Sequence, residues 1–213
     1  MHRVYAHAAA TFFLIFYLVT PAVAHPHMWI DLETRVILDD HDGLIAIQQT
    51  WLFDDFYSAA VIEEAALDPG GVEVGIQKDV NTLMTALEPY SYFTSVKHGN
   101  KNLSLTLVGD VEWKVIQKRV QMSFKTVIDE RIDLNSQSLS YAIFDPTYYI
   151  EMVHFDDAIV KIEGKAASSC HSRIEQPNPS AEAVALSQSA ALDSNPDDTI
   201  GRLFAETVYV NCR

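Results

Sequence analysis

The sequence predicts an α+β fold that is mostly antiparallel sheet built from hairpins, with a few helices inserted between them. Polar and apolar residues alternate over residues 30–38, and the same period of two, typical of a strand with one wet face, recurs in later segments. Turn-forming residues separate these segments, beginning with the run from Asp39 to Gly43. Apolar residues with helical spacing are confined to short stretches, so helices are expected to be the minority.

The first 24 residues have the pattern of a cleavable signal peptide. Arg3 is the only formal charge before an apolar run over residues 8–19. Pro21 and the small residues of Ala22-Val23-Ala24 follow, as a signal peptidase requires. The apolar run is too short for a transmembrane helix, which needs roughly 20 residues. We therefore expect residues 1–24 to be removed on export to the periplasm, which leaves His25 as the first residue of a chain that does not span the membrane.

Strand patterns account for most of the chain. Residues 28–53 are expected to form a hairpin whose turn ends at Gly43. A second hairpin is expected from residues 92–96 and 103–108, joined by a turn at residues 98–101. Further strands are expected at residues 111–115, 120–127, 139–144, 149–155, 159–163 and 208–210.

Helices are expected in the segments where apolar residues follow a capping residue or precede a proline. They run from Asp54 or Asp55 to Leu67, over residues 80–87 before Pro89, over residues 181–186 after a capping Ser180, and as a short turn around Leu203. Either aspartate suits its position, because a carboxylate accepts the free N–H groups of a helix start and interacts favourably with the helix dipole.

Cys170 and Cys212 are the two cysteines of the chain. In an oxidising compartment such a pair is expected to form a disulfide, which would close a loop of about 40 residues and contribute about 4 kcal/mol in the chain-entropy model. We expect residues 25–165 to form the α+β domain and residues 166–213 to form a disulfide-tethered segment packed on it. A metal site built from two reduced thiols is the alternative.

Charge and missing motifs narrow the functional classes. The formal net charge is −14, which repels nucleic acid and anionic lipid and attracts cations, although acidity also serves solubility. The chain has no Gly-x-Ser-x-Gly, Cys-x-x-Cys, His-Glu-x-x-His or phosphate-binding glycine loop. No enzymatic activity is therefore predicted.

The candidate metal ligands are two imidazoles and three carboxylates. His25 and His27 stand at the expected new N-terminus, and a neutral imidazole is the commonest protein ligand for metals, although a plain polar end is the alternative. Asp54, Asp55 and Asp145 lie at expected strand ends, where capping or turn formation also explains them. The metal interpretation is that these strand ends converge on the N-terminus and share one cation. Mixed imidazole and carboxylate ligation suits zinc, nickel or cobalt.

The other histidines are weaker candidates. His154 lies on an expected strand and His171 lies beside Cys170, so either could add a nitrogen ligand. His41 and His98 fall in expected turns and are expected to be solvated.

Several motifs carry a family resemblance. They are His25-Pro26-His27 with Ile30-Asp31, the run from Trp51 to Ser58, Tyr92-Phe93, the run from Phe144 to Ile150, and a closing pattern of Cys170, Pro177-Asn178-Pro179, Phe204-Ala205-Glu206 and Cys212. Over essentially the whole mature chain these motifs resemble a Gram-negative periplasmic family of unassigned function, often labelled a component of an uncharacterised ABC-type transport system. The family's genes commonly neighbour nickel/cobalt-type permeases, and zinc handling has been suggested for it.

The resemblance implies a periplasmic accessory protein that binds a divalent metal ion, zinc above nickel or cobalt, and serves an inner-membrane metal permease. One alternative is a copper protein or enzyme with a histidine brace at His25, completed by His154 or His171. The other is a metal-free interaction module, in which aromatic residues such as Trp51, Phe56, Tyr148 and Tyr149 form a docking face or simply core.

Overall fold

A computed structural model of the protein describes residues 26–39, 43–134, 138–155, 160–165, 167–190 and 200–212. The expected signal peptide, His25 and His41 lie outside these residues. No helix among the described residues is both long enough and apolar enough to cross a membrane.

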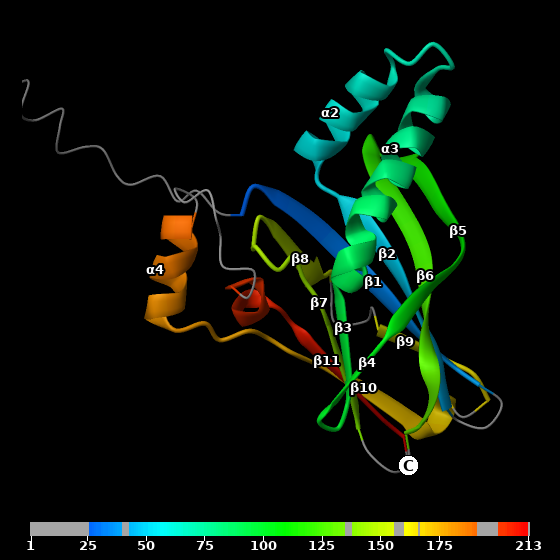
Figure 1. Ribbon diagram of the computed structural model, residues 1–213, viewed down its shortest axis with the longest axis vertical. Helices are drawn as coiled ribbons and strands as arrows, with labels where there is room; N and C mark the ends of the chain where they lie inside the picture. The colour runs from blue at the N-terminus through cyan, green and yellow to red at the C-terminus, as the bar shows by residue number, and fades with distance from the viewer. Residues whose placement is uncertain are drawn as a thin grey trace, which may run out of the picture.

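Two sheets form the body of the molecule (Figure 1). The first has the strand order β5-β6-β2-β1-β8, with β9 also paired to β1, and the second has the order β10-β11-β7-β3-β4. The strands are β1 (Met28–Leu38), β2 (Gly43–Phe53), β3 (Thr94–His98), β4 (Lys101–Leu103), β5 (Leu105–Ile116), β6 (Arg119–Asp133), β7 (Leu139–Ile143), β8 (Ile150–His154), β9 (Val160–Glu163), β10 (Cys170–Glu175) and β11 (Thr207–Cys212). The pairings are antiparallel except those of β1 with β8 and β9.

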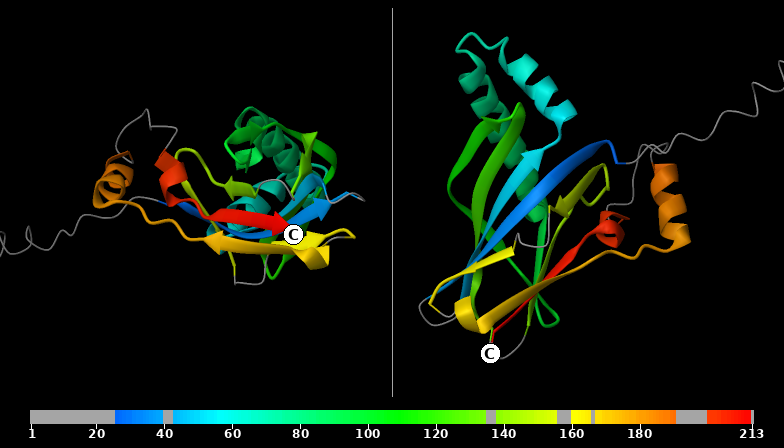
Figure 2. Two further views of the ribbon diagram at one scale, coloured as in Figure 1. Left: turned by 90° about the horizontal axis from the view of Figure 1, so that it is seen from below. Right: turned by 180° about the vertical axis from the view of Figure 1, so that it is seen from behind.

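The helices lie at two separate places, as Figures 1 and 2 show. They are α2 (Asp55–Ala65), α3 (Val72–Leu87) and α4 (Ala181–Ala190), with short 3-10 turns η1 (Glu88–Phe93), η2 (Ala167–Ser169) and η3 (Ile200–Phe204). α2 and α3 form a helical hairpin at the end where β2 finishes, whereas α4 stands on the other side of the molecule. The predicted α+β class, with mostly antiparallel sheet, is confirmed.

The core lies between the two sheets and under α3. β1 and β2 form the expected hairpin, with Ile30 opposite Phe53 at its open end, and alternate residues face the core. Trp51 is buried at the centre, where its ring stacks on Phe93 with centroids 6.3 Å apart and meets Phe124 edge-on at 5.1 Å. These aromatic contacts tie β2 to β6 and to η1.

Three details differ from the sequence-based expectation. The hairpin of β3 pairs only as far as Leu103, after which the chain crosses to the first sheet and residues 105–116 form one strand, β5. The register between β5 and β6 shifts between Val108 and Glu112, where Gly109 has a φ of 74°. The residues at this shift look like a strand boundary in the sequence, although the strand continues through them. α3 begins at Val72 and includes Gly75, where a Cβ would lie 2.6 Å from Ala65 Cα, so this glycine permits close packing on α2. β10 was not expected, because its sequence is mostly polar.

The disulfide predicted between Cys170 and Cys212 is confirmed. The two cysteines lie directly opposite one another at one end of the β10–β11 pair. The helix capped by Ser180 is also present, since Ser180 Oγ accepts the Ala183 N–H at 3.2 Å.

Candidate functional site

His27 lies directly before β1 and is held against the segment that precedes β8. Its backbone N–H donates a 2.9 Å hydrogen bond to the carbonyl of Tyr149. The two side-chain rings stack with centroids 4.8 Å apart and planes inclined by 30°. The imidazole is exposed to solvent. The start of β1 is therefore tied to one place on the surface.

Glu151, on β8, is a carboxylate near the start of β1 that no sequence pattern indicated. It lies opposite Trp29 in the parallel pairing of β1 with β8, and the Trp29 indole N–H donates a 2.8 Å hydrogen bond to its Oε2. The stacked rings of His27 and Tyr149 lie just before the strand pair that carries Trp29 and Glu151. Among the described residues, Oε1 of Glu151 has no hydrogen-bond partner. The structure thus orients a carboxylate near the start of β1, the strand that His27 precedes.

Asp54 connects β1, β2 and α2. Its Oδ1 accepts the N–H groups of Phe56 at 2.8 Å and Tyr57 at 2.9 Å, and its Oδ2 accepts the N–H of Trp29 at 3.0 Å. Of the two aspartates expected to cap this helix, Asp54 is the N-cap, and Asp55 lies in the first turn with its side chain exposed. Asp54 therefore fixes the entry of α2 next to the candidate site.

Asp145 is 5% exposed and stabilises the turn that leads into β8. Its carboxylate accepts the N–H groups of Thr147 at 2.9 Å and Ile150 at 3.0 Å, and it also contacts the Thr147 hydroxyl. Gly201 packs against this turn so closely that a Cβ would lie 1.8 Å from the Asp145 carbonyl oxygen. The first role of Asp145 is therefore to shape the turn that carries Tyr149.

The structure brings the segments around His27, Asp54 and Asp145 together at one end of β1. Within the described ranges, no group of three or more His, Cys, Asp or Glu side chains is arranged to hold a metal ion, and His25 is outside those ranges. The assignment of these residues as ligands stays a prediction.

His154 faces the interface between the sheets and has a side chain only 3% exposed. Its Nδ1 lies 2.8 Å from Oε2 of Glu206, and its Nε2 lies 3.1 Å from the hydroxyl of Thr34. A carboxylate only accepts, so Nδ1 carries the proton. Thr34 in turn contacts the buried Tyr141 hydroxyl at 2.6 Å. His154 is thus part of a buried polar chain across the sheets, whereas the other weak candidate, His171, is exposed on β10.

Glu206 is the charged member of this buried chain. It accepts the His154 backbone N–H at 2.7 Å, in addition to Nδ1, and the Gln176 side-chain amide at 2.7 Å. Burial opposes its ionisation, but the hydrogen bonds from His154 and Gln176 outweigh that effect and hold the pKa of the carboxyl below its usual value. Sequence reasoning missed this role, because its partners are far away in the chain. The local sequence held one indication of this role, which is that Glu206 directly precedes the short apolar strand β11.

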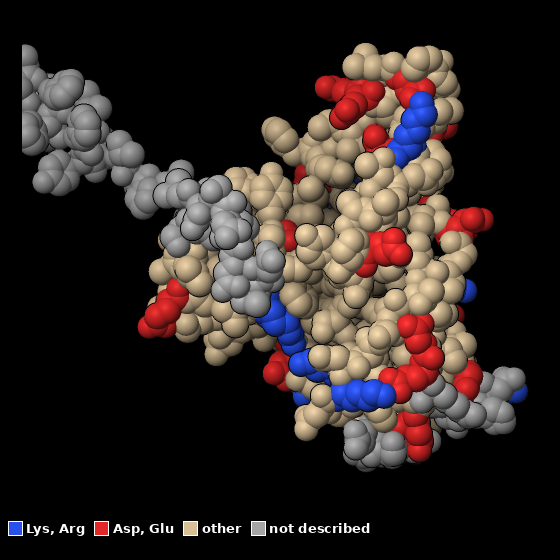
Figure 3. All heavy atoms as spheres, viewed as in Figure 1, with Lys and Arg blue, Asp and Glu red and all other residues tan. Residues whose placement is uncertain are grey.

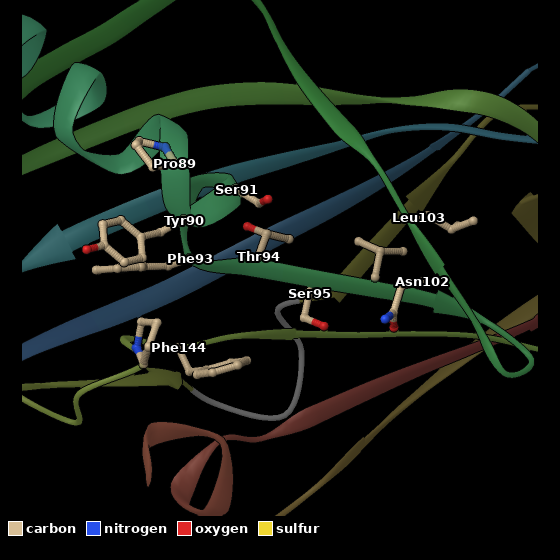
Figure 4. A pocket seen from close by; sticks show the side chains of 11 residues that line it. Pro89, Tyr90, Ser91, Phe93, Thr94, Ser95, Asn102, Leu103 and Phe144 are labelled. Atoms are coloured by element: carbon tan, nitrogen blue, oxygen red, sulfur yellow. The ribbon is translucent and has the colours of Figure 1, made fainter. Parts of the chain in front are cut away.

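A separate pocket of about 350 Å³ lies between η1, β3 and the residues around Asp145 (Figure 4). The rings of Tyr90, Phe93 and Phe144 line it together with the hydroxyl of Ser95 and the amide of Asn102. Among the residues that the structure describes, its lining includes no charged side chain and no imidazole, so it differs in chemistry from the candidate metal site.

Comparison with known proteins finds similarity over almost the whole chain. The family model described as "Protein of unknown function (DUF1007)" matches residues 10–212. A relative from Haemophilus influenzae, described as "Uncharacterized protein", is 23% identical over 193 residues that cover 89% of this chain and 92% of the relative. The match of the family model to most of the chain establishes that the chain is a member of a family.

Proposed function

The chain belongs to the DUF1007 family, and from this premise we propose that it is a periplasmic accessory protein that binds a divalent metal ion for an inner-membrane metal permease. Zinc is the first candidate, and nickel and cobalt are the others. The expected signal peptide and the Cys170–Cys212 disulfide support an oxidising, extracytoplasmic compartment.

The observation that carries the proposal is that His27 and Glu151 are both held in place at the start of the β1–β8 pair. Stacking on Tyr149 and the backbone hydrogen bond hold His27, while Trp29 orients the carboxylate. Hydrogen-bonded partners that orient a ligand in this way are typical of metal sites. One imidazole and one carboxylate do not complete a tetrahedral zinc site, so His25, through its imidazole and α-amine, is proposed as the further ligand.

Asp54 and Asp145 take positioning roles in this proposal, with direct ligation as their second possible role. Each already accepts several N–H groups, and Asp145 is almost fully buried. Asp55 is exposed at the start of α2 and remains available as an acidic ligand. His154 has both ring nitrogens engaged in the buried chain, so it is the weakest of the predicted ligands.

Titration calorimetry with zinc and nickel at neutral pH tests the proposal on protein that begins at His25. Replacing His27 with Ala should lower the affinity at least tenfold, and Glu151→Gln should lower it while the Trp29 hydrogen bond is kept. His98→Ala is the matched control, because this histidine is solvent-accessible on β3, away from β1 and β8, and should leave the affinity unchanged. Equal affinities in all four proteins would contradict the proposed ligands.

A further inference from the structure

α2 leaves large apolar side chains in solvent. Phe56 is 92% exposed in its first turn, and Leu67, just beyond its other end, is 83% exposed. The residues that the helix buries are Ser58 and Ala65, both small. The apolar side chains of α2 are therefore only partly used by packing within the described part of the chain.

A groove of about 560 Å³ lies beside this helix, between α2 and the turn that joins β5 to β6. Ala59, Ile62 and Val115 supply its apolar lining, and Val115 is 44% exposed. Asp55 and Glu63 line the groove on the α2 side. Lys118 lines it on the side of the β5–β6 turn. The groove thus combines an apolar lining with two carboxylates from α2 and one basic side chain from the β5–β6 turn.

The surrounding charge is also mainly acidic. Figure 3 shows Asp and Glu gathered over the α2–α3 end, with few Lys or Arg. Lys78, on α3, is already paired with Asp68. Such a surface repels an acidic protein or an anionic membrane and attracts a basic one.

We propose that this groove, together with Phe56, docks a segment of a partner protein that presents an apolar side chain flanked by Lys or Arg. An apolar element seated in a groove with complementary charge at the rim is a recurrent mode of protein recognition. Exposed aromatic residues such as Phe56 are typical anchors of such contacts.

Asp54 connects the helix that borders the groove to the start of β1. Oδ2 of Asp54 accepts the N–H of Trp29, and Oδ1 accepts that of Phe56, so the first turn of α2 is bonded to the start of β1. A partner in the groove would therefore contact Asp55, the residue that follows Asp54 in this turn. The identity of that partner as the metal permease rests on the proposed function.

Site-specific photocrosslinking in exporting cells tests the docking surface. A photoreactive benzophenone amino acid replaces Phe56 in the full chain, and mass spectrometry identifies the crosslinked peptide. The expected product is one protein, crosslinked through a segment with an apolar residue next to Lys or Arg. The matched control places the same group at Ile45, which is 40% exposed near the opposite end of β2, and should give at least about fivefold less of this product.

Charge reversal separates docking from chance contact. Asp55→Lys combined with Glu63→Lys should reduce the Phe56 crosslink at least about fivefold, because the basic flanks would then be repelled. Crosslinks to a second copy of this chain, to lipid, or to many proteins without a basic-flanked apolar segment would overturn the proposal, as would a product unaffected by charge reversal.

Zinc binding is measured separately, so that the two proposals can fail independently. Phe56→Ser should bind zinc within about twofold of the unmodified protein, because it changes no proposed ligand. A specific crosslink to a protein other than a permease supports the docking groove and overturns the permease assignment. Normal zinc binding without any specific crosslink overturns the groove and leaves the metal proposal standing.

Discussion

Asp54 receives three backbone N–H groups from two segments that are 25 residues or more apart from one another in the chain. Asp54→Ala should lower the free energy of unfolding by about 1–2 kcal/mol, because it removes both the helix cap and the bond to Trp29. Urea unfolding monitored by circular dichroism measures the change. Asp55→Ala is the control and should change stability by less than about 0.5 kcal/mol, since its side chain is exposed. Equal effects of the two substitutions would contradict the assigned cap.

Glu206 makes stability dependent on pH. Its pKa is lower in the folded protein than in the unfolded chain, so its contribution is present above the unfolded value and is lost as pH falls through the folded value. Glu206→Gln should lower the free energy of unfolding by about 1–3 kcal/mol at pH 7, because one N–H group then faces an amide NH₂. The difference between the two proteins should shrink as the pH is lowered below about 4.

Chemical unfolding measured from pH 3 to pH 7 checks this expectation. Glu163→Gln is the control, since Glu163 forms an exposed ion pair with Arg35 at 3.0 Å and should matter by less than about 1 kcal/mol. A stability difference for Glu206→Gln that stays constant across this pH range would show that the Glu206 carboxyl has the same pKa in the folded and the unfolded protein.

The residues that act locally could be predicted from the sequence, whereas those that act across the sheets could not. Asp54 and Ser180 follow capping rules that operate over three or four residues, and both caps are present. The bond from His154 to Glu206 joins residues 52 positions apart, and the bond from Trp29 to Glu151 joins residues 122 positions apart. No local pattern encodes either contact.

The β10–β11 pair is the element that the disulfide stabilises. Cys170 and Cys212 enclose a sequence separation of 42 residues, for which the chain-entropy model gives about 4 kcal/mol. Reduction should therefore increase amide hydrogen exchange in β10 and β11, while β1, β2 and β6 stay protected. Hydrogen exchange with mass spectrometry on oxidised and reduced protein measures this. Equal loss of protection in both sheets would show that the body also depends on the bridge.

Elements whose sequence has a strong hydrophobic period could be predicted, whereas elements that depend on pairing or packing with distant segments could not. The β1–β2 hairpin and α2 follow from alternation, helical spacing and turn residues. β10 lacks such a period because it pairs at the edge of its sheet, where few of its side chains are buried. The left-handed turn at Ser91, Tyr92 and Phe93 contains no glycine, so the sequence gives no sign of it. Packing of Phe93 on Trp51 helps to hold that turn.

At the scale of the whole molecule, composition predicts the class of protein, and topology determines which side chains lie near His27. The acidic charge and the N-terminal pattern predict an exported protein that favours cations. The candidate site, however, depends on the parallel pairing of β1 with β8, which places Glu151 opposite Trp29, two residues after His27. Parallel pairing between distant segments is governed by the complete fold, so the carboxylate opposite Trp29 could not be identified before the fold was known.

Elemental analysis of the native protein, purified from exporting cells without chelators, tests the central claim most directly. The account predicts close to one zinc, nickel or cobalt ion per chain in the mature protein. The variant with both His25→Ala and His27→Ala should contain little of that metal, whereas His98→Ala should retain it, because His98 is on β3 in the second sheet. Native protein without metal would contradict this prediction and favour a metal-free docking protein. Equal metal content in the double histidine variant would show that His25 and His27 are not the ligands.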